Sequence, residues 1–182
     1  DYVRLHTNAS FLIKEGFDFS DGLFSGWDAE NESYDKSSWQ YELNARRHAK
    51  TDPTLQHPNS VFQLMKKHYS RYTPEKVASI SGCTVEEFLG AAEIICSSGR
   101  ADRRGTVLYA LGWTQHSYSV QLIHGAAMLQ LLLGNIGVPG GGINAQRGHS
   151  NIQGATDLGA WNMLPGYLKV PKASQTSLQK YN

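Results

Sequence analysis

The sequence has little cysteine, no excess of charge of either sign and no long hydrophobic run. Its two cysteines, Cys83 and Cys96, do not form a C-x-x-C motif, so by themselves they provide neither a zinc site nor an iron–sulfur cluster. The 17 Lys and Arg residues nearly balance the 16 Asp and Glu residues and are dispersed. This distribution argues against binding of nucleic acid or of an anionic membrane surface.

Several other signals are also missing. The longest mainly apolar stretch, residues 125–133, is shorter than the roughly 20 residues needed to cross a bilayer, so we expect no membrane insertion. No serine lies in a G-x-S-x-G motif and the histidines lack H-x-x-x-H spacing, which disfavours a serine hydrolase and a histidine metal site. The chain begins without Met or a signal segment, and we expect it to be an internal piece of a longer protein.

The first third of the sequence predicts little regular structure. Residues 7–13 end in a short apolar run, typical of the end of a strand or of the loop that leaves it. Residues 14–58 are rich in aromatic, Asp, Ser and Gly residues and show no sustained periodicity. Because no basic groove accompanies these aromatic residues, we expect them to anchor a long irregular segment, not to form a stacking platform for nucleic acid.

Three helices are predicted next, each from an N-terminal capping signal. The first helix begins at a Ser60/Gln63 capping box and runs to about Tyr69. The second begins at Thr73-Pro74, runs to Ile80 and is stopped by Gly82. The third begins at a Thr84/Glu87 capping box and runs to about Gly99. A continuous apolar run at 106–112 then predicts a buried parallel strand. A long helix from Ser117 or Ser119 to about Leu133, closed by Gly134-Asn135, follows it.

The polar residues that follow the predicted strand form the first candidate site. In open α/β sheets, ligands bind at the carboxyl ends of the strands. Gln115 and His116, at the exit of the strand, would therefore meet a cofactor. Ordinary loop polarity is the alternative explanation of these two residues.

The second candidate site is a glycine-rich run at residues 137–157, which contains one arginine and one histidine. Arg147 offers a guanidinium fork that matches a carboxylate or phosphate, and His149 could bind substrate or transfer a proton. The neutral polar residues around them suit a polar heterocycle, which indicates a cofactor-lined pocket with one anion clamp. A buried structural ion pair for Arg147, a space-filling His149 and a simple helix-terminating turn at 137–142 remain alternatives.

Three ordered motifs resemble the catalytic subunit of formate dehydrogenases, members of the molybdopterin oxidoreductase family, and most closely their respiratory, periplasm-facing branch. They are YALGWTQH at 109–116, MLQLLLGNIG at 128–137 and PGGGINAQRGHSNIQG at 139–154. Residues 2–26, 52–58 and 158–167 also resemble that branch. The resemblance therefore covers nearly the whole chain.

The resemblance implies an α/β fold that is an interior slice of a larger subunit. Residues 1–147 would be the later part of a domain with a Rossmann-like parallel sheet, carrying the irregular insertion at about 14–58. Residues 148–182 would begin the next cofactor-binding domain. A [4Fe-4S] cluster and the selenocysteine or cysteine that ligates the metal would belong to parts of the subunit outside this chain, so the chain alone should be inactive.

The resemblance also implies cofactor, partners and location. The cofactor would be a molybdenum or tungsten bis-(molybdopterin guanine dinucleotide) centre and the substrate formate. Partners would be the remainder of the catalytic subunit, an iron–sulfur electron-transfer subunit and an optional cytochrome subunit, in the periplasm.

The functional residues carried over from the family fall in two groups. Arg147 matches the active-site arginine that orients formate, and His149 matches a hydrogen-bonding position beside it. Leu111 and Gln115 match positions that contact the pterin cofactor. The further cofactor-binding candidates are their neighbours Gly112, Trp113 and His116, and Gly148, which follows Arg147. No metal ligand is expected in this chain. A nitrate reductase-like oxidoreductase on the same scaffold and a non-catalytic binding or scaffold module remain as alternatives.

Overall fold

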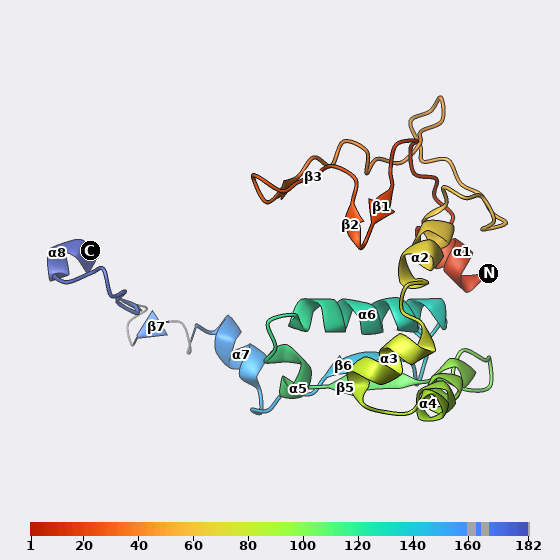
Figure 1. Ribbon diagram of the computed structural model, residues 1–182. Helices are drawn as coiled ribbons and strands as arrows, with labels where there is room; N and C mark the ends of the chain where they lie inside the picture. Colours follow the sequence, from red (N-terminus) through yellow and green to blue (C-terminus); the bar gives the residue numbers. More distant parts are fainter. Residues whose placement is uncertain (160–162, 165–167, 182) are drawn as a thin grey trace. The chain divides into compact units, whose positions relative to one another are not determined.

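A computed structural model describes residues 1–159, 163–164 and 168–181 and shows a mixed α/β chain (Figure 1). The elements in order are α1 Tyr2–His6, β1 Phe19–Ser20, β2 Leu23–Phe24, β3 Trp27–Asp28, β4 Ser33–Tyr34, α2 Val61–Tyr69, α3 Pro74–Ser81, α4 Val85–Ser97, β5 Thr106–Tyr109, α5 Leu111–Thr114, α6 Ser119–Leu132, β6 Gly142–Ala145, α7 Ile152–Asp157, β7 Met163–Leu164, β8 Leu168–Lys169 and α8 Leu178–Tyr181. Part of the 158–167 segment that resembles the family lies outside the described residues.

The chain divides into two compact units. Unit 1 comprises Asp1–Val107 and Val120–Ile143, and unit 2 comprises Leu108–Ser119 and Asn144–Asn182. The boundary runs through the paired strands β5 and β6, so both strands begin in unit 1 and end in unit 2. The domain division expected at residue 147 from the family resemblance stays a prediction.

The irregular segment at 14–58 contains two short antiparallel hairpins, β1–β2 and β3–β4. Its aromatic rings pack against one another: Phe24 meets Trp39 edge-on at a centroid distance of 5.4 Å. They also pack against α2, where the ring of Phe19 lies 5.2 Å from that of His68. These contacts confirm that the aromatic residues anchor the segment, because rings that pack against one another and against α2 remove apolar surface from water.

Residues 11–13 are extended, as the apolar run predicts, but they form single bridges instead of a strand. Phe11 pairs with Thr51, and Leu12 with Ser60. Leu12 is one of the few buried apolar residues in the described part of unit 1. Ile13 also pairs with Tyr41, so the irregular segment returns twice to this short extended stretch, at Tyr41 and at Thr51.

The predicted caps of α2, α3 and α4 are largely confirmed. The side chain of Thr84 accepts from the N–H of Glu87 while the Glu87 carboxylate accepts from the N–H of Thr84, which completes a capping box. At α2, Ser60 caps the helix, but the other half of the predicted box is wrong. The side-chain amide of Gln63 donates through Nε2 to the carbonyl of Leu55 at 2.6 Å, because the preceding turn brings that carbonyl within reach.

The long helix α6 ends as its sequence predicts. Gly134 adopts a left-handed conformation with φ of +69°. The N–H of Asn135 then donates back to the carbonyl of Gln130 at 2.9 Å, which is the 6→1 bond of a Schellman motif. Glycine suits this position because a Cβ is unfavourable at such a φ.

The strand predicted at 106–112 is shorter and less buried than expected. β5 stops at Tyr109, because the carbonyl of Ala110 accepts from the N–H of Trp113 and starts the short helix α5. Leu108 is 62% exposed, so the prediction of a buried strand is wrong for this chain. β5 and β6 form a small two-stranded parallel sheet.

Candidate functional site

The carboxyl ends of β5 and β6 bring the two candidate segments together. The N–H of Gln146 donates to the carbonyl of Tyr109 at 2.7 Å. The segment that leaves β5 carries the cofactor-binding candidates, and the one that leaves β6 carries Arg147 and His149. All eight site residues predicted from the sequence lie in unit 2.

The sequence predicted that the cofactor-binding candidates lie at the end of a strand or in the loop that follows it. In the structure, three of them lie in helix α5 instead. Leu111 is its first residue, and Gly112 and Trp113 follow. The Trp113 ring stacks on that of Tyr109, with centroids 5.4 Å apart and planes 19° from parallel. This stack fixes the indole against the strand end.

The helix is followed by two exposed polar candidates. The N–H of Gln115 donates to the carbonyl of Leu111 at 3.0 Å, which closes the helix. The ring of His116 lies 5.4 Å from that of Tyr118. Tyr118 was not among the site residues predicted from the sequence. Leu111, Gln115 and His116 are all exposed.

Arg147 lies one residue beyond the last hydrogen bond between β5 and β6, and its side chain is exposed. Within the described part of the chain it forms no ion pair, including with Asp157, the next acid along the sequence. The alternative of a buried structural ion pair therefore has no support in these residues. A permanently charged guanidinium in this setting can accept an anion from outside the chain.

His149 is exposed, and its ring contacts the carbonyl of Ser150 through Nδ1 at 2.9 Å. A carbonyl oxygen only accepts, so this contact requires the proton to be on Nδ1. In the neutral ring Nε2 is then the acceptor nitrogen. His149 is therefore suited to accept a hydrogen bond or a proton through Nε2.

Two glycines leave room for a ligand near these side chains. Among the described residues, apart from its chain neighbours and the backbone of its own helix, a Cβ placed on Gly112 or on Gly148 would meet no atom within 4 Å. Gly154 differs, since its Cβ would lie 2.3 Å from the side chain of Asn151. Asn151, with φ of +52°, precedes α7 and is a further constrained position that the sequence analysis did not identify. Asn tolerates this conformation better than most residues.

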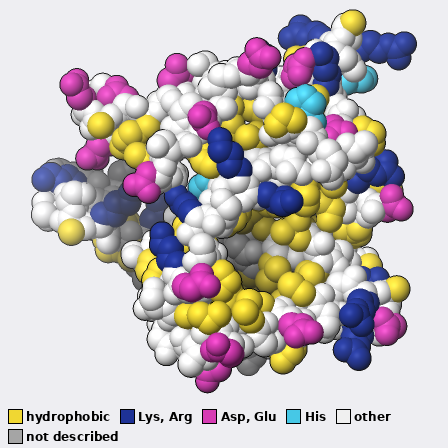
Figure 2. Space-filling view, turned by 45° about the vertical axis from the view of Figure 1, so that its right-hand side comes forward, with side chains coloured by type: hydrophobic (Ala, Val, Ile, Leu, Met, Phe, Trp, Pro, Cys, Tyr) yellow, Lys and Arg dark blue, Asp and Glu magenta, His cyan; other side chains and the backbone are white. Residues whose placement is uncertain are grey.

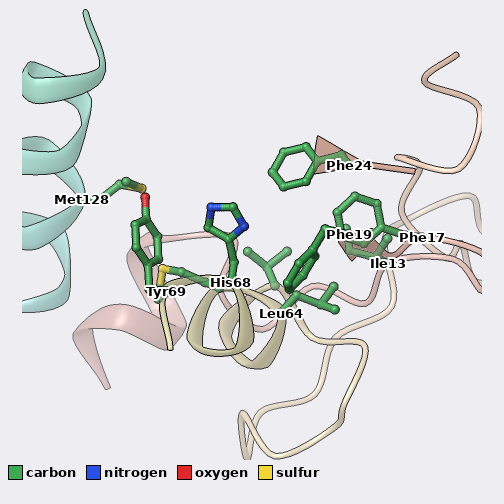
Figure 3. Close-up of a pocket in the computed structure, with 10 residues that line it drawn as sticks. Ile13, Phe17, Phe19, Phe24, Leu64, His68, Tyr69 and Met128 are labelled. Atoms are coloured by element: carbon green, nitrogen blue, oxygen red, sulfur yellow. The ribbon is translucent and has the colours of Figure 1, made fainter. Parts of the chain in front are cut away.

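A cavity of about 270 Å³ lies in unit 1 (Figure 3). Its lining is almost entirely apolar, with Phe17, Phe19, Phe24 and Met128 around the imidazole of His68. Burial, and to a smaller extent the nearby charge of Arg71, lower the pKa of His68 below its ordinary value. The cavity contains none of the predicted site residues, and its apolar walls do not match a polar cofactor or a carboxylate.

The described surface mixes charges of both signs. On the face seen in Figure 2, Lys and Arg side chains are interspersed with Asp and Glu. The three ion pairs found in the described residues are exposed and involve Arg4, Lys50 and Lys67. The described residues contain no cluster of three or more metal-ligating side chains and no helix with the length and apolar character of a membrane span.

Comparison with known proteins relates this chain to the major and alpha subunits of formate dehydrogenases. No family model matches the chain. It is 54% identical over all 182 residues to the nitrate-inducible formate dehydrogenase major subunit of Escherichia coli (strain K12). It is 48% identical over its full length both to the formate dehydrogenase subunit alpha of Megalodesulfovibrio gigas and to the formate dehydrogenase 2 subunit alpha (cytochrome c-553) of Nitratidesulfovibrio vulgaris.

The match covers 100% of this chain but 18% of each of these relatives. The chain is therefore homologous, along its whole length, to one segment of the formate dehydrogenase major or alpha subunits. This confirms the resemblance seen in the sequence motifs.

Proposed function

We propose that this chain is part of a catalytic subunit that oxidises formate to CO2, and that Arg147 orients the substrate. The observation that carries the proposal is the position of Arg147. It directly follows the hydrogen bond between Gln146 and Tyr109, and its guanidinium is exposed without an ion-pair partner in the described chain. The 54% and 48% identity of all 182 residues of this chain to formate dehydrogenase subunits supports formate over nitrate as the substrate.

The residues around Arg147 fit a bis-(molybdopterin guanine dinucleotide) cofactor. Such a group needs neutral hydrogen-bonding partners for its pterin and backbone that it can approach closely. Gln115 and Trp113 supply the partners, and the open space beside Gly112 and Gly148 supplies the approach. Leu111 and His116 would complete the cofactor contacts from either end of the same segment.

The metal centre, molybdenum or tungsten, would supply the acceptor for the hydride of formate. Arg147 would hold the formate carboxylate by two parallel hydrogen bonds and fix the direction of the C–H bond. Its charge stabilises the anionic substrate more than neutral CO2, so the product is held less strongly. His149 would accept a hydrogen bond beside the substrate or move a proton there.

The remaining parts of the proposal concern the whole protein. The pair β5–β6 would belong to a Rossmann-like parallel sheet of residues 1–147, and residues 148–182 would begin a second cofactor-binding domain. Other parts of the subunit would hold a [4Fe-4S] cluster and the metal ligand. An iron–sulfur subunit, and a cytochrome as in the name of one relative, would accept the electrons, in the periplasm.

Exposed apolar side chains support a larger structure around this chain. Ile94 on α4 is 74% exposed and Ile80 on α3 is 73% exposed. Large apolar side chains at such exposure, repeated on neighbouring helices, mark surfaces that other protein covers. Figure 1 shows α3 and α4 next to each other.

The test uses the intact subunit with its cofactor. Arg147→Lys should raise KM for formate and lower kcat, because an ammonium group cannot reproduce the two parallel hydrogen bonds of a guanidinium. Arg103→Lys is the matched control, since Arg103 is exposed in a turn of unit 1 and should leave both constants unchanged. Unchanged kinetics in Arg147→Lys would remove this residue from the mechanism.

The same preparation separates the alternatives. A nitrate reductase-like enzyme would reduce nitrate and leave formate unchanged. A scaffold module would contain neither metal nor pterin in the intact subunit. Metal and pterin content, measured beside formate oxidation, decides among the three.

A further inference from the structure

Gln130 of α6 has a nearly buried amide that binds three parts of unit 1. Its exposed fraction is 3%. Nε2 donates to the carbonyl of Gly105 at 2.8 Å and to that of Gly142 at 2.5 Å. Oε1 accepts from Nδ2 of Asn135 at 3.0 Å. Both N–H groups and the oxygen of this amide are therefore used.

Asn135 extends the network to α4. Its side chain is fully buried, and Nδ2 also donates to Oγ of Ser98 at 3.1 Å. Close packing surrounds these bonds. A Cβ on Gly105 would lie 2.7 Å from Oγ of Ser98, and one on Gly141 would lie 2.0 Å from the carbonyl oxygen of Asn135. The network thus occupies a junction that has no space for larger side chains.

The two carbonyls held by Gln130 have a specific place in the sheet. Gly105 directly precedes β5, and Gly142 is the first residue of β6. The hydroxyl of Thr106 also donates to the carbonyl of Gly142, at 3.2 Å. One side-chain amide therefore ties together the starts of two parallel strands, whose other ends lead to α5 and to Arg147.

We infer that Gln130 is a positioning residue that sets the stagger of β5 against β6, and thereby the placement of the segments that carry Gln115 and Arg147. A shift by one residue along a strand is about 3.3 Å, and misplacement of a substrate-holding group by about 1 Å can cost a hundredfold in rate. Only an amide of this length offers two donors and an acceptor here; Glu, Met and Leu lack at least one of these.

The inference rests on the proposed function for its kinetic part, and the test therefore has a second, structural readout. In the intact, cofactor-loaded subunit, Gln130→Met keeps the side-chain volume similar but removes both donors. We expect KM for formate to rise about tenfold and amide hydrogen exchange at Gln146 to become about tenfold faster. Gln121→Met, on an exposed position of the same helix, should change neither.

A second variant covers the case in which Gln130→Met does not fold. Gln130→Glu keeps the shape, and its protonated carboxyl can donate one hydrogen bond while its carboxylate donates none. Burial against two carbonyl oxygens raises the pKa of that glutamate, so the defect in KM should grow as pH rises and shrink as pH falls. The wild-type KM, measured over the same pH range, serves as the reference.

The outcomes are distinguishable. A change in both KM and exchange at Gln146 supports the inference. Faster exchange at Gln146 with an unchanged KM would assign Gln130 to stability alone and overturn the inference. An unchanged exchange rate at Gln146 would also overturn it. Absence of formate oxidation in the wild type would instead refute the proposed function, while the exchange measurement would still test whether Gln130 holds the two strands together.

Discussion

The backbone N–H of Gln146 donates to the carbonyl of Tyr109 across a distance of 2.7 Å. This bond is found where two strands, separated by helix α6 in the sequence, have reached their carboxyl ends. It joins the segment with the cofactor-binding candidates to the segment with Arg147. This main-chain contact therefore links the two halves of the candidate site where the strand pair ends.

Gln146→Pro should weaken this junction, because proline has no backbone N–H to donate. The loss of one such hydrogen bond costs about 1 kcal/mol, and the carbonyl of Tyr109 would be left without this partner. In the intact subunit we expect a higher KM for formate and faster amide exchange in 142–145. Gln146→Ala keeps the N–H and should behave as the wild type; equal kinetics of the two variants would contradict the prediction.

Gly148→Ala tests the space beside the substrate arginine. Apart from its two neighbours in the sequence, no described residue has an atom within 4 Å of the added methyl, so the fold should tolerate it. If the pterin cofactor lies against this glycine, the methyl should reduce bound pterin in the intact subunit severalfold. Gly90→Ala, also free of contacts within 4 Å but on α4, is the control. Full pterin content in both variants would exclude close approach at Gly148.

Thr84→Ala should loosen the start of α4. The mutation removes the hydroxyl that accepts from the N–H of Glu87, and the loss of an N-cap costs about 1 kcal/mol. Amide exchange at Glu87 should become about fivefold faster, which is the factor that corresponds to that energy. Thr84→Ser retains the hydroxyl and should exchange like the wild type.

The turn at residues 52–57 should weaken only in strong acid. Hydrogen bonds from the Thr54 hydroxyl and from the N–H of His57 favour the charged carboxylate and lower the pKa of Asp52 from 3.8 to about 2. Because the pKa of Asp52 is lower in the folded state, the charged carboxylate stabilises the folded turn fully above the ordinary pKa of 3.8. This stabilisation is lost as pH falls through about 2.

An NMR titration of the Asp52 carboxyl carbon measures this directly. We expect a midpoint near 2, and a midpoint at the ordinary value of 3.8 would show that the turn does not hold the carboxylate. In Asp52→Asn, the amide shift of His57 should lose its dependence on pH over the same range.

Local signals in the sequence were sufficient for the starts of α2, α3 and α4 and for the ends of α3 and α6, but they did not predict α1, α5, α7 or α8. The Thr84/Glu87 box, Pro74 after Thr73, and Gly82 and Gly134 after the last turns each act within a few residues, so no distant contact is needed to interpret them. The box at Ser60 is the exception that shows the limit. Gln63 bonds Leu55, a partner that only the preceding turn places within reach.

The end of β5 was not predictable in the same way. An apolar run from 106 to 112 has the composition of a buried strand, and nothing local marks Ala110 as the point where the chain turns into α5. The stack of Trp113 on Tyr109 and the hydrogen bond to Ala110 decide it. These contacts span only three or four residues, but composition does not reveal them, because one continuous apolar stretch is compatible with both strand and helix.

The sequence alone determined the capped starts of α2, α3 and α4, the glycine ends of α3 and α6, the irregular aromatic segment and the residue types of the candidate site, since capping, glycine conformation and side-chain chemistry are properties of neighbouring residues. It also determined the relationship to formate dehydrogenase subunits through its ordered motifs. Only the tertiary structure decided that Gln146 bonds to Tyr109 and that Gln130 binds the starts of both strands. The reason is physical: hydrogen bonds between residues 12 to 37 positions apart form only after the chain has folded back on itself.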